Sequence, residues 1–178
     1  MKNLSEDFTI TLFDTAQSDA FFNLISKNRK RLEVFFAGTV SRTKTIIETE
    51  IYCEDIKKRI EEKSYFPYII RDKETDEFIG LIDVKNIDWN VPKAEMGYFI
   101  DSTYEGKGVV SKALKFIIDY LVENYKFKKL LCRVNSENVG SIKVAMKNGF
   151  ELEGTIRSDY RTSNGKIVDL NYYGRVFE

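Results

Sequence analysis

The chain has 178 residues, of which 43% are hydrophobic and 31% charged, as is ordinary for one globular domain, here expected to span residues 1–178. Lys plus Arg and Asp plus Glu both number 28, and this zero formal net charge argues against a nucleic-acid partner. The absence of histidine excludes Ser-His-Asp and Cys-His nucleophilic machinery and removes the commonest zinc ligand, so no metal is expected.

The N-terminal third of the sequence predicts one strand followed by two helices. Residues 8–13 alternate apolar and polar side chains like a strand, and residues 16–36 indicate a helix with a break near Asn28. A second helix, ending near Lys63, is indicated by isoleucines that recur mostly every three to five residues: Ile46, Ile47, Ile51, Ile56 and Ile60.

Three strands are predicted in the middle of the chain. Residues 64–71 and 77–87 flank a turn-like segment and therefore predict a hairpin. A third strand is expected over residues 95–101.

The remaining sequence predicts helix, strand, helix and two strands. Apolar spacing predicts a helix up to about residue 125, residues 129–134 look like a buried strand, and a short helix opening after Ser136 should end at Gly149. Two last strands, 151–159 and 167–177, surround a turn. This order implies an α/β or α+β fold with a mixed, mostly antiparallel sheet and helices on both faces.

The start of the chain and its cysteines bear on where the protein works. The first residues contain no long apolar run, so we expect neither a signal peptide nor a membrane partner. Cys53 and Cys132 lack Cys-x-x-Cys spacing and are expected to be free thiols in a reducing cytoplasm.

A glycine-containing segment, YEGKGVVS at residues 104–111, stands between a predicted strand and a predicted helix. Helix-terminal N–H groups favour an anion, and glycine lets the backbone approach it closely. The nucleotide P-loop pattern is missing, and Gly106-x-Gly108 lacks the third glycine of the dinucleotide fingerprint. By itself the segment is compatible with a plain turn or with an anion site.

Three successive segments, EMGYFID, YEGKGVVSKAL and RVNSENVGSIKVAMKNGFELEG, resemble the GCN5-related N-acetyltransferase (GNAT) family. Its loop pattern [QR]-x-x-G-x-[GA] is met at Gly108, while Glu105 and Val110 depart from it. The signature of the RimJ/RimL-like branch is matched by a series of residues near the C-terminus: Asn138, Ser141, Val144, Lys147, Gly149, Phe150, Glu153 and Gly154.

The resemblance implies that acetyl-CoA is the co-substrate. The strand over residues 95–101 would splay from the strand over residues 129–135, so that the backbone of residues 98–100 pairs with pantetheine. Asn138, a favoured N-cap residue, would also contact the cofactor. Glu105 should then point away from the phosphates. The full cofactor set expected from the resemblance is Tyr98, Phe99, Ile100, Gly106, Lys107, Gly108, Val109, Val110, Ser111 and Asn138.

Two residues are candidates for the chemistry. Glu95 is a candidate general base acting directly or through water, although a strand-edge charge explains it as well. Many relatives carry a tyrosine acid where this chain has Ala145, which leaves Ser141 to protonate the thiolate or simply to cap its helix. The thiolate of CoA can also leave unaided near neutral pH.

The sequence says least about the molecule that accepts the acetyl group. Phe35, Phe36 and Tyr160 are expected in loops and could wall its pocket. The expected activity is acetyl transfer to a primary amine, either a protein N-terminus or a small molecule. A non-catalytic acyl-CoA-binding module of the same fold is the alternative, and a homodimer is left open.

Overall fold

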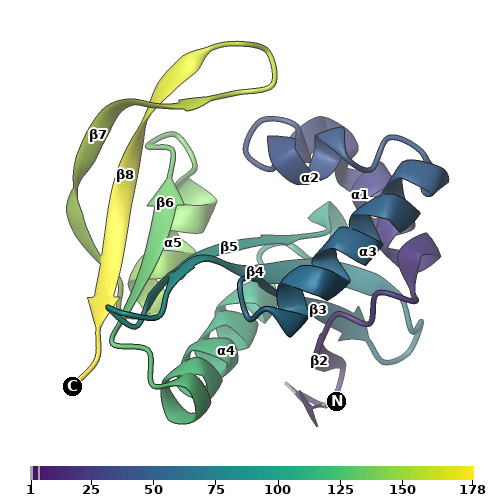
Figure 1. The fold of residues 1–178 in the computed structure, drawn as a ribbon, viewed down its shortest axis with the longest axis horizontal. Coiled ribbons are helices and arrows are strands. Elements are labelled where there is room, and N and C mark those ends of the chain that lie inside the picture. The colour runs from purple at the N-terminus through teal and green to yellow at the C-terminus, as the bar shows by residue number, and fades with distance from the viewer. Residues whose placement is uncertain (1, 4) are drawn as a thin grey trace.

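The structure, a computed structural model, describes residues 2–3 and 5–178 (Figure 1). Its helical elements are α1 (Ser18–Leu32), α2 (Ala37–Ser41), α3 (Ile46–Glu61), the 3-10 turn η1 (Ser102–Tyr104), α4 (Val109–Tyr125) and α5 (Val139–Lys147). Its strands are β1 (Lys2–Asn3), β2 (Phe8–Leu12), β3 (Phe66–Asp72), β4 (Phe78–Asp88), β5 (Lys93–Ile100), β6 (Lys129–Val134), β7 (Glu151–Arg161) and β8 (Ile167–Val176).

All eight strands form one sheet in the order β1-β2-β3-β4-β5-β6-β8-β7. Neighbouring strands are antiparallel except β5 and β6, which are parallel. The register between β5 and β6 covers three pairs and ends at Glu95 opposite Leu131. Beyond that pair the two strands diverge, and we call residues 96–100 of β5 together with residues 132–134 of β6 the fork. The expected mixed sheet, splayed at its centre, is confirmed.

Helices cover both faces of the sheet. Helix α4 turns one apolar side toward the sheet, and its residues Leu114, Ile117 and Ile118 join a core with alternate residues of β3 to β6. On the opposite face α1 and α3 build a second core with residues such as Phe21 and Ile56. Figure 1 shows the β7–β8 hairpin extending beyond both layers.

The predicted break near Asn28 is wrong. Helix α1 runs through Asn28 to Leu32 and ends before a turn that leads to the short helix α2. Asn28 is buried, and its side-chain amide donates to Leu24 O and to the Asp101 carboxylate. Its bond to Leu24 O is to the carbonyl four residues earlier, which is compatible with the helix, and Asp101 holds the same amide from outside it.

Other boundaries lie close to the predictions. Strand β5 starts two residues before the predicted strand, and β7 continues two residues further than expected. The turn η1, the short strand β1 and the short helix α2 were not predicted. Within the described residues, no helix is long and apolar enough to cross a bilayer.

Candidate active site

The glycine segment forms the turn into helix α4. Gly106 and Gly108 adopt left-handed backbone angles, with φ of 74° and 73°, which residues with a Cβ rarely adopt. Gly108 is the N-cap of α4 and offers no capping side chain. The N–H groups of Val109, Val110 and Ser111 therefore begin the helix without intrahelical partners, and such groups can donate to an anion.

Side chains around this turn leave the backbone as its main binding surface. Val109, Val110 and Ser111 have buried side chains, and the Ser111 hydroxyl accepts a hydrogen bond at 3.2 Å from the side-chain amide of Asn148, the C-cap residue of α5. Lys107 lies with its ammonium 4.8 Å from the centre of the Tyr104 ring. Any contribution of these three buried residues to an anion site comes through their N–H groups.

The acidic residue at the start of the turn, Glu105, forms an ion pair with Arg31 of α1. Its carboxylate is thus held beside the Arg31 guanidinium of α1. The same guanidinium donates to Asn28 Oδ1 at 3.0 Å and to the carbonyl oxygen of Ile100.

A hollow of ≈ 600 Å³ lies beside Tyr104. It is lined by Glu6, Asp7, Phe8, Asp72, Lys73, Glu74, Thr103, Tyr104 and Lys107. Carboxylates outnumber cations in this lining, so the hollow does not suit a polyphosphate.

The backbone of β5 alternates its hydrogen-bonding direction along the fork. The Asp101 N–H donates to Ile79 O, and Phe99 lies opposite Leu81 in the same antiparallel register. Alternation then directs the N–H and C=O groups of Phe99 toward β4, and those of Tyr98 and Ile100 into the fork. Of the three predicted pantetheine-binding residues, Tyr98 has both backbone groups directed into the fork, and Ile100 has its N–H, while its carbonyl oxygen already accepts from Arg31.

Helix α5 borders the other side of the fork. Asn138 is its N-cap, and its side-chain oxygen accepts from the Ser141 N–H at 3.1 Å, so the predicted cap is present. The Tyr98 hydroxyl donates to Ser141 O at 2.7 Å, tying α5 to β5. Burial raises the pKa of Tyr98 well above its ordinary value, so this phenol keeps its proton.

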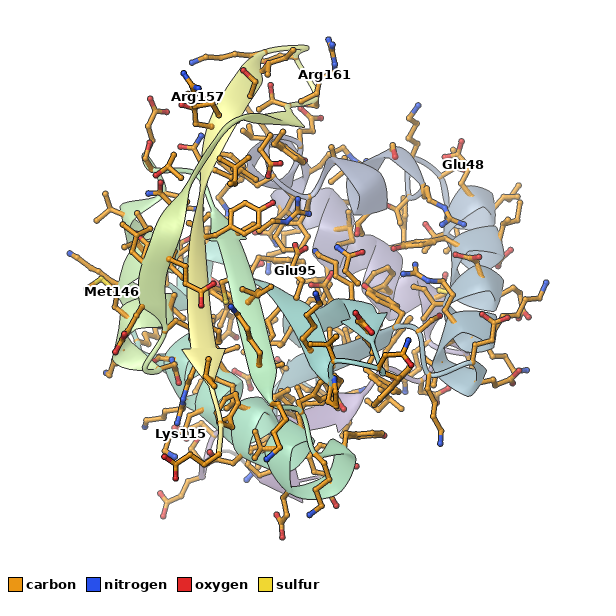
Figure 2. The ribbon with its side chains drawn as sticks, turned by 60° about the vertical axis from the view of Figure 1, so that its left-hand side comes forward. Glu48, Glu95, Lys115, Met146, Arg157 and Arg161 are labelled. Atoms are coloured by element: carbon orange, nitrogen blue, oxygen red, sulfur yellow. The ribbon has the colours of Figure 1, made fainter. Side chains whose placement is uncertain are left out.

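Glu95 lies at the last β5–β6 pair, where the fork opens (Figure 2). Its side chain is nearly buried, and Oε2 accepts from Arg133 Nε and from Asn86 Nδ2, both at 2.8 Å. Oε1 lies 3.9 Å from Lys85 Nζ. Glu95 is thus an anchored, ion-paired carboxylate, and Oε1 is the atom with capacity to accept a further hydrogen bond.

A pocket of ≈ 250 Å³ opens beside Glu95. Residues of four strands line it: Asn86, Lys93, Ala94, Glu95, Leu131, Arg133 and Tyr172. Asn86 reaches Glu95 because a register shift in β4 gives it a φ of 50°. Tyr172 donates from its hydroxyl to Asp159, which also lies 3.5 Å from Arg133.

The charged side chains around Glu95 form ion pairs that balance one another. Burial alone would lower the pKa of Lys85, but the carboxylates of Asp83 and Glu95 outweigh it and raise that pKa. The pKa of Arg133 is raised in the same way, because Glu95 outweighs the effect of burial. Both cations keep their charge at neutral pH.

The predicted acceptor residues fall into two places. Phe36 packs edge-on against Phe99, with ring centres 5.1 Å apart, and its ring centre is 5.6 Å from Lys85 Nζ. Phe35 precedes it on the exposed turn before α2. Tyr160 does not lie in a loop as expected: it is half-buried in strand β7, opposite Val168, on the hairpin whose outer part carries Arg157 and Arg161 in Figure 2. Among the three predicted residues, Phe36 is therefore the one linked to Glu95, through the side chain of Lys85.

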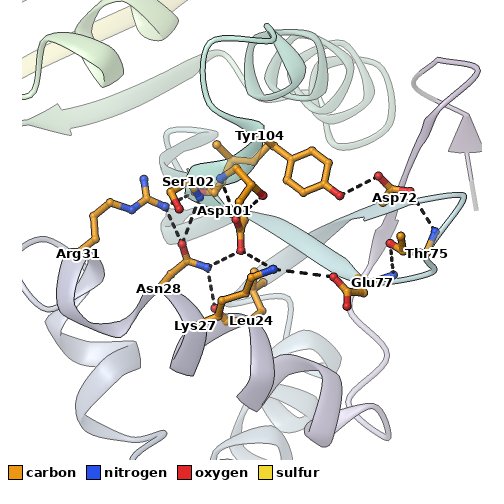
Figure 3. Close-up of polar contacts among 12 residues, drawn as sticks. Leu24, Lys27, Asn28, Arg31, Asp72, Thr75, Glu77, Asp101, Ser102 and Tyr104 are labelled. Carbon is orange, nitrogen blue, oxygen red and sulfur yellow. Dashed lines mark hydrogen bonds and ion pairs between the residues drawn. The ribbon is translucent and has the colours of Figure 1, made fainter.

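A buried carboxylate, Asp101, joins α1 to the end of β5 (Figure 3). It accepts from the N–H and hydroxyl of Thr103 at 2.9 and 2.7 Å, from Asn28 Nδ2 at 3.1 Å, and lies 3.3 Å from Lys27 Nζ. Burial alone would raise the pKa of Asp101, but these partners outweigh it and lower the pKa to about 2. The network fixes the segment that leads into the glycine turn.

Sequence reasoning missed most partners of Glu95 and of the glycine turn. Arg133 had a signal, since it is a charged residue within the alternating run at residues 129–134. Asn86 had none, because it reaches Glu95 only through the register shift in β4, and Tyr172 and Arg31 had none, because their contacts join elements that are distant in sequence.

Comparisons with known proteins show the family of the chain. The acetyltransferase (GNAT) domain family matches residues 8–151. A ribosomal-protein-serine acetyltransferase of Escherichia coli (strain K12) is 31% identical over 103 residues, which is 58% of this chain and 57% of that protein. The putative ribosomal N-acetyltransferase YdaF of Bacillus subtilis (strain 168) is 30% identical over 173 residues, covering 96% of this chain and 91% of the relative.

A solved structure, the RimL ribosomal L7/L12 alpha-N-protein acetyltransferase in complex with coenzyme A, superposes with a TM-score of 0.90. It shares 21% identity, with 98% of this chain and 97% of that chain covered, and shows the likeness of fold. The chain belongs to the GNAT acetyltransferase family, with ribosomal-protein acetyltransferases of the RimJ/RimL type among its relatives.

Proposed function

We propose that the protein transfers an acetyl group from acetyl-CoA to a primary amine by direct attack of the amine on the thioester. The observation that carries the proposal is the fork, which opens at Glu95 and is flanked by the N-termini of α4 and α5. The glycine turn fits a phosphate, since a Cβ at Gly106 or Gly108 would meet no described atom within 4 Å.

The residues have distinct roles in this proposal. The N–H groups at the start of α4 hold the pyrophosphate, and the fork-facing backbone of Tyr98 and Ile100 pairs with the pantetheine arm. An N–H group of β5 would polarise the thioester carbonyl as negative charge develops on its oxygen. Lys107 adds a positive charge beside the turn.

Glu95 would receive the amine. Since Oε2 is occupied by Arg133 and Asn86, Oε1 accepts the hydrogen bond from the acceptor nitrogen or from a water that takes its proton. Ala145 is buried and offers no acid, and the Tyr98 phenol is committed to Ser141 O. We propose that the thiolate of CoA leaves without a tyrosine acid, with Ser141 as the nearest hydroxyl on α5.

The pocket favours an acceptor with a single amine, such as a peptide N-terminus. Three carboxylates on β4 and β5 are already paired with cations: Asp83 with Lys85, Glu95 with Arg133, and Asp88 with Lys93 at 3.8 Å. A polyamine would need several unpaired carboxylates to bind its further ammonium groups. The ribosomal-protein acetyltransferases among the relatives support the same choice.

One assay tests the function. Acetyl-CoA is titrated first, and free thiol is then followed with short N-terminal peptides, single amino acids and spermidine as acceptors. Thiol release that depends on a peptide N-terminus is the expected result. Tight binding without release for any acceptor would instead support a non-catalytic acyl-CoA-binding module, and release with spermidine alone would overturn the peptide acceptor.

A further inference from the structure

Arg31 stands at the end of the fork although it belongs to α1. Its guanidinium donates to the carbonyl oxygen of Ile100, and the β5 register directs that carbonyl away from β4 and into the fork. Arg31 also pairs with Glu105, the residue directly before Gly106. It therefore contacts the end of β5 through the Ile100 carbonyl and the start of the glycine turn through the Glu105 side chain.

The guanidinium is fixed before any ligand arrives. Asn28 accepts from Arg31 at 3.0 Å and is itself buried, bonded to Leu24 O and to the carboxylate of Asp101 (Figure 3). A charged group held by such partners loses little conformational freedom when it binds a ligand. An unrestrained surface arginine would lose more.

Arg31 still has capacity to bind. Three contacts, to Glu105, Asn28 and Ile100, use three of the five N–H donors of a guanidinium. The side chain remains 40% exposed, so the remaining donors are within reach of a ligand. A planar guanidinium matches phosphate oxygens in a way that a lysine ammonium does not.

We propose that Arg31 binds a phosphate group of coenzyme A, together with the N–H groups at the start of α4. The inference rests on the proposed use of acetyl-CoA and adds a cation that comes from α1. Glu105 serves here as the anchor of Arg31.

The test compares two ligands and two matched variants. Coenzyme A carries the phosphates, and S-acetylpantetheine carries the arm and the thioester without them. Arg31→Gln removes the proposed contact, while Lys30→Gln removes one charge from the neighbouring exposed position of the same helix. Dissociation constants are measured by calorimetry for coenzyme A and by NMR titration for the weaker S-acetylpantetheine.

We expect Arg31→Gln to weaken coenzyme A binding by roughly tenfold to a hundredfold, the range of a charge-assisted hydrogen bond. Its affinity for S-acetylpantetheine should stay within about twofold of wild type, and Lys30→Gln should change neither ligand beyond about twofold. Wild-type affinity for coenzyme A should also fall more steeply with salt than that of Arg31→Gln.

Two results would overturn the assignment. One is coenzyme A binding in Arg31→Gln equal to wild type, and the other is an equal loss for both ligands, which indicates a structural role. Arg31→Lys keeps the charge and gives the same comparison if the glutamine variant does not fold, with a several-fold loss expected for coenzyme A alone. Failure of the wild type to bind coenzyme A would refute the proposed function instead.

Discussion

Replacing Asp101 by asparagine removes the charge that connects α1 to the end of β5. The carboxylate is 1% exposed and accepts four contacts, from Thr103, Asn28 and Lys27. An asparagine amide would turn an N–H donor toward Asn28 Nδ2 and Lys27 Nζ, which are donors themselves. The variant therefore loses ion pairing and gains a conflict between donors.

The magnitude follows from the lowered pKa. A carboxyl with a pKa of about 2 in the folded state and about 3.9 when unfolded contributes about 2–3 kcal/mol at pH 7. Because the folded pKa is the lower one, this stability is full above about pH 4 and is lost as pH falls toward 2. Between pH 5 and pH 3 the advantage of wild type over Asp101→Asn should shrink by about 1 kcal/mol.

Urea unfolding of both proteins at pH 7, 5, 4 and 3 measures this difference directly. Asp119→Asn is the matched control, since Asp119 is 57% exposed and pairs with Lys115 on the surface of α4. We expect it to change the free energy of unfolding by less than about 0.5 kcal/mol. If Asp101→Asn is as stable as the control at pH 7, or if its deficit does not depend on pH, the reasoning is wrong.

Three further substitutions test the proposed site. Glu95→Gln should lower kcat by at least about tenfold and leave acetyl-CoA affinity within about twofold, and unchanged turnover across the pH range contradicts its role. Gly108→Ala places a Cβ at a left-handed backbone position, so the free energy of unfolding measured in urea should fall by about 1–2 kcal/mol. Calorimetry should also show a weaker affinity for coenzyme A. Wild-type values in both measurements would refute this role of the turn. Asn138→Ala removes the N-cap of α5 and should cost about 1 kcal/mol in urea unfolding, whereas equal stability would show that the cap contributes nothing.

Most of the fold could be predicted from local patterns in the sequence. The apolar spacing that predicted a helix to residue 125 reflects the face of α4 that is buried on the sheet, and Asn138 acts as the cap that its residue type suggests. These features are decided within a few residues, so the sequence displays them.

The features that were missed depend on contacts across the chain. Asn28 stays helical because Asp101, 73 residues away, accepts from its amide. Glu95 is a candidate general base or a strand-edge charge from its strand position, and in the structure Arg133 from β6 and Asn86 from the irregular part of β4 hold it. No periodicity in the sequence reveals such pairs, because they exist only after the sheet has formed.

Hydrogen exchange of the β5 amides with and without coenzyme A tests the central claim, that the cofactor arm pairs with the fork-facing backbone of β5. The register directs the Phe99 N–H toward β4 and those of Tyr98 and Ile100 into the fork. We predict slow exchange at Phe99 in both states, and slowing at Tyr98 and Ile100 only when coenzyme A is bound. Unchanged exchange at Tyr98 and Ile100 under saturating coenzyme A would contradict the account.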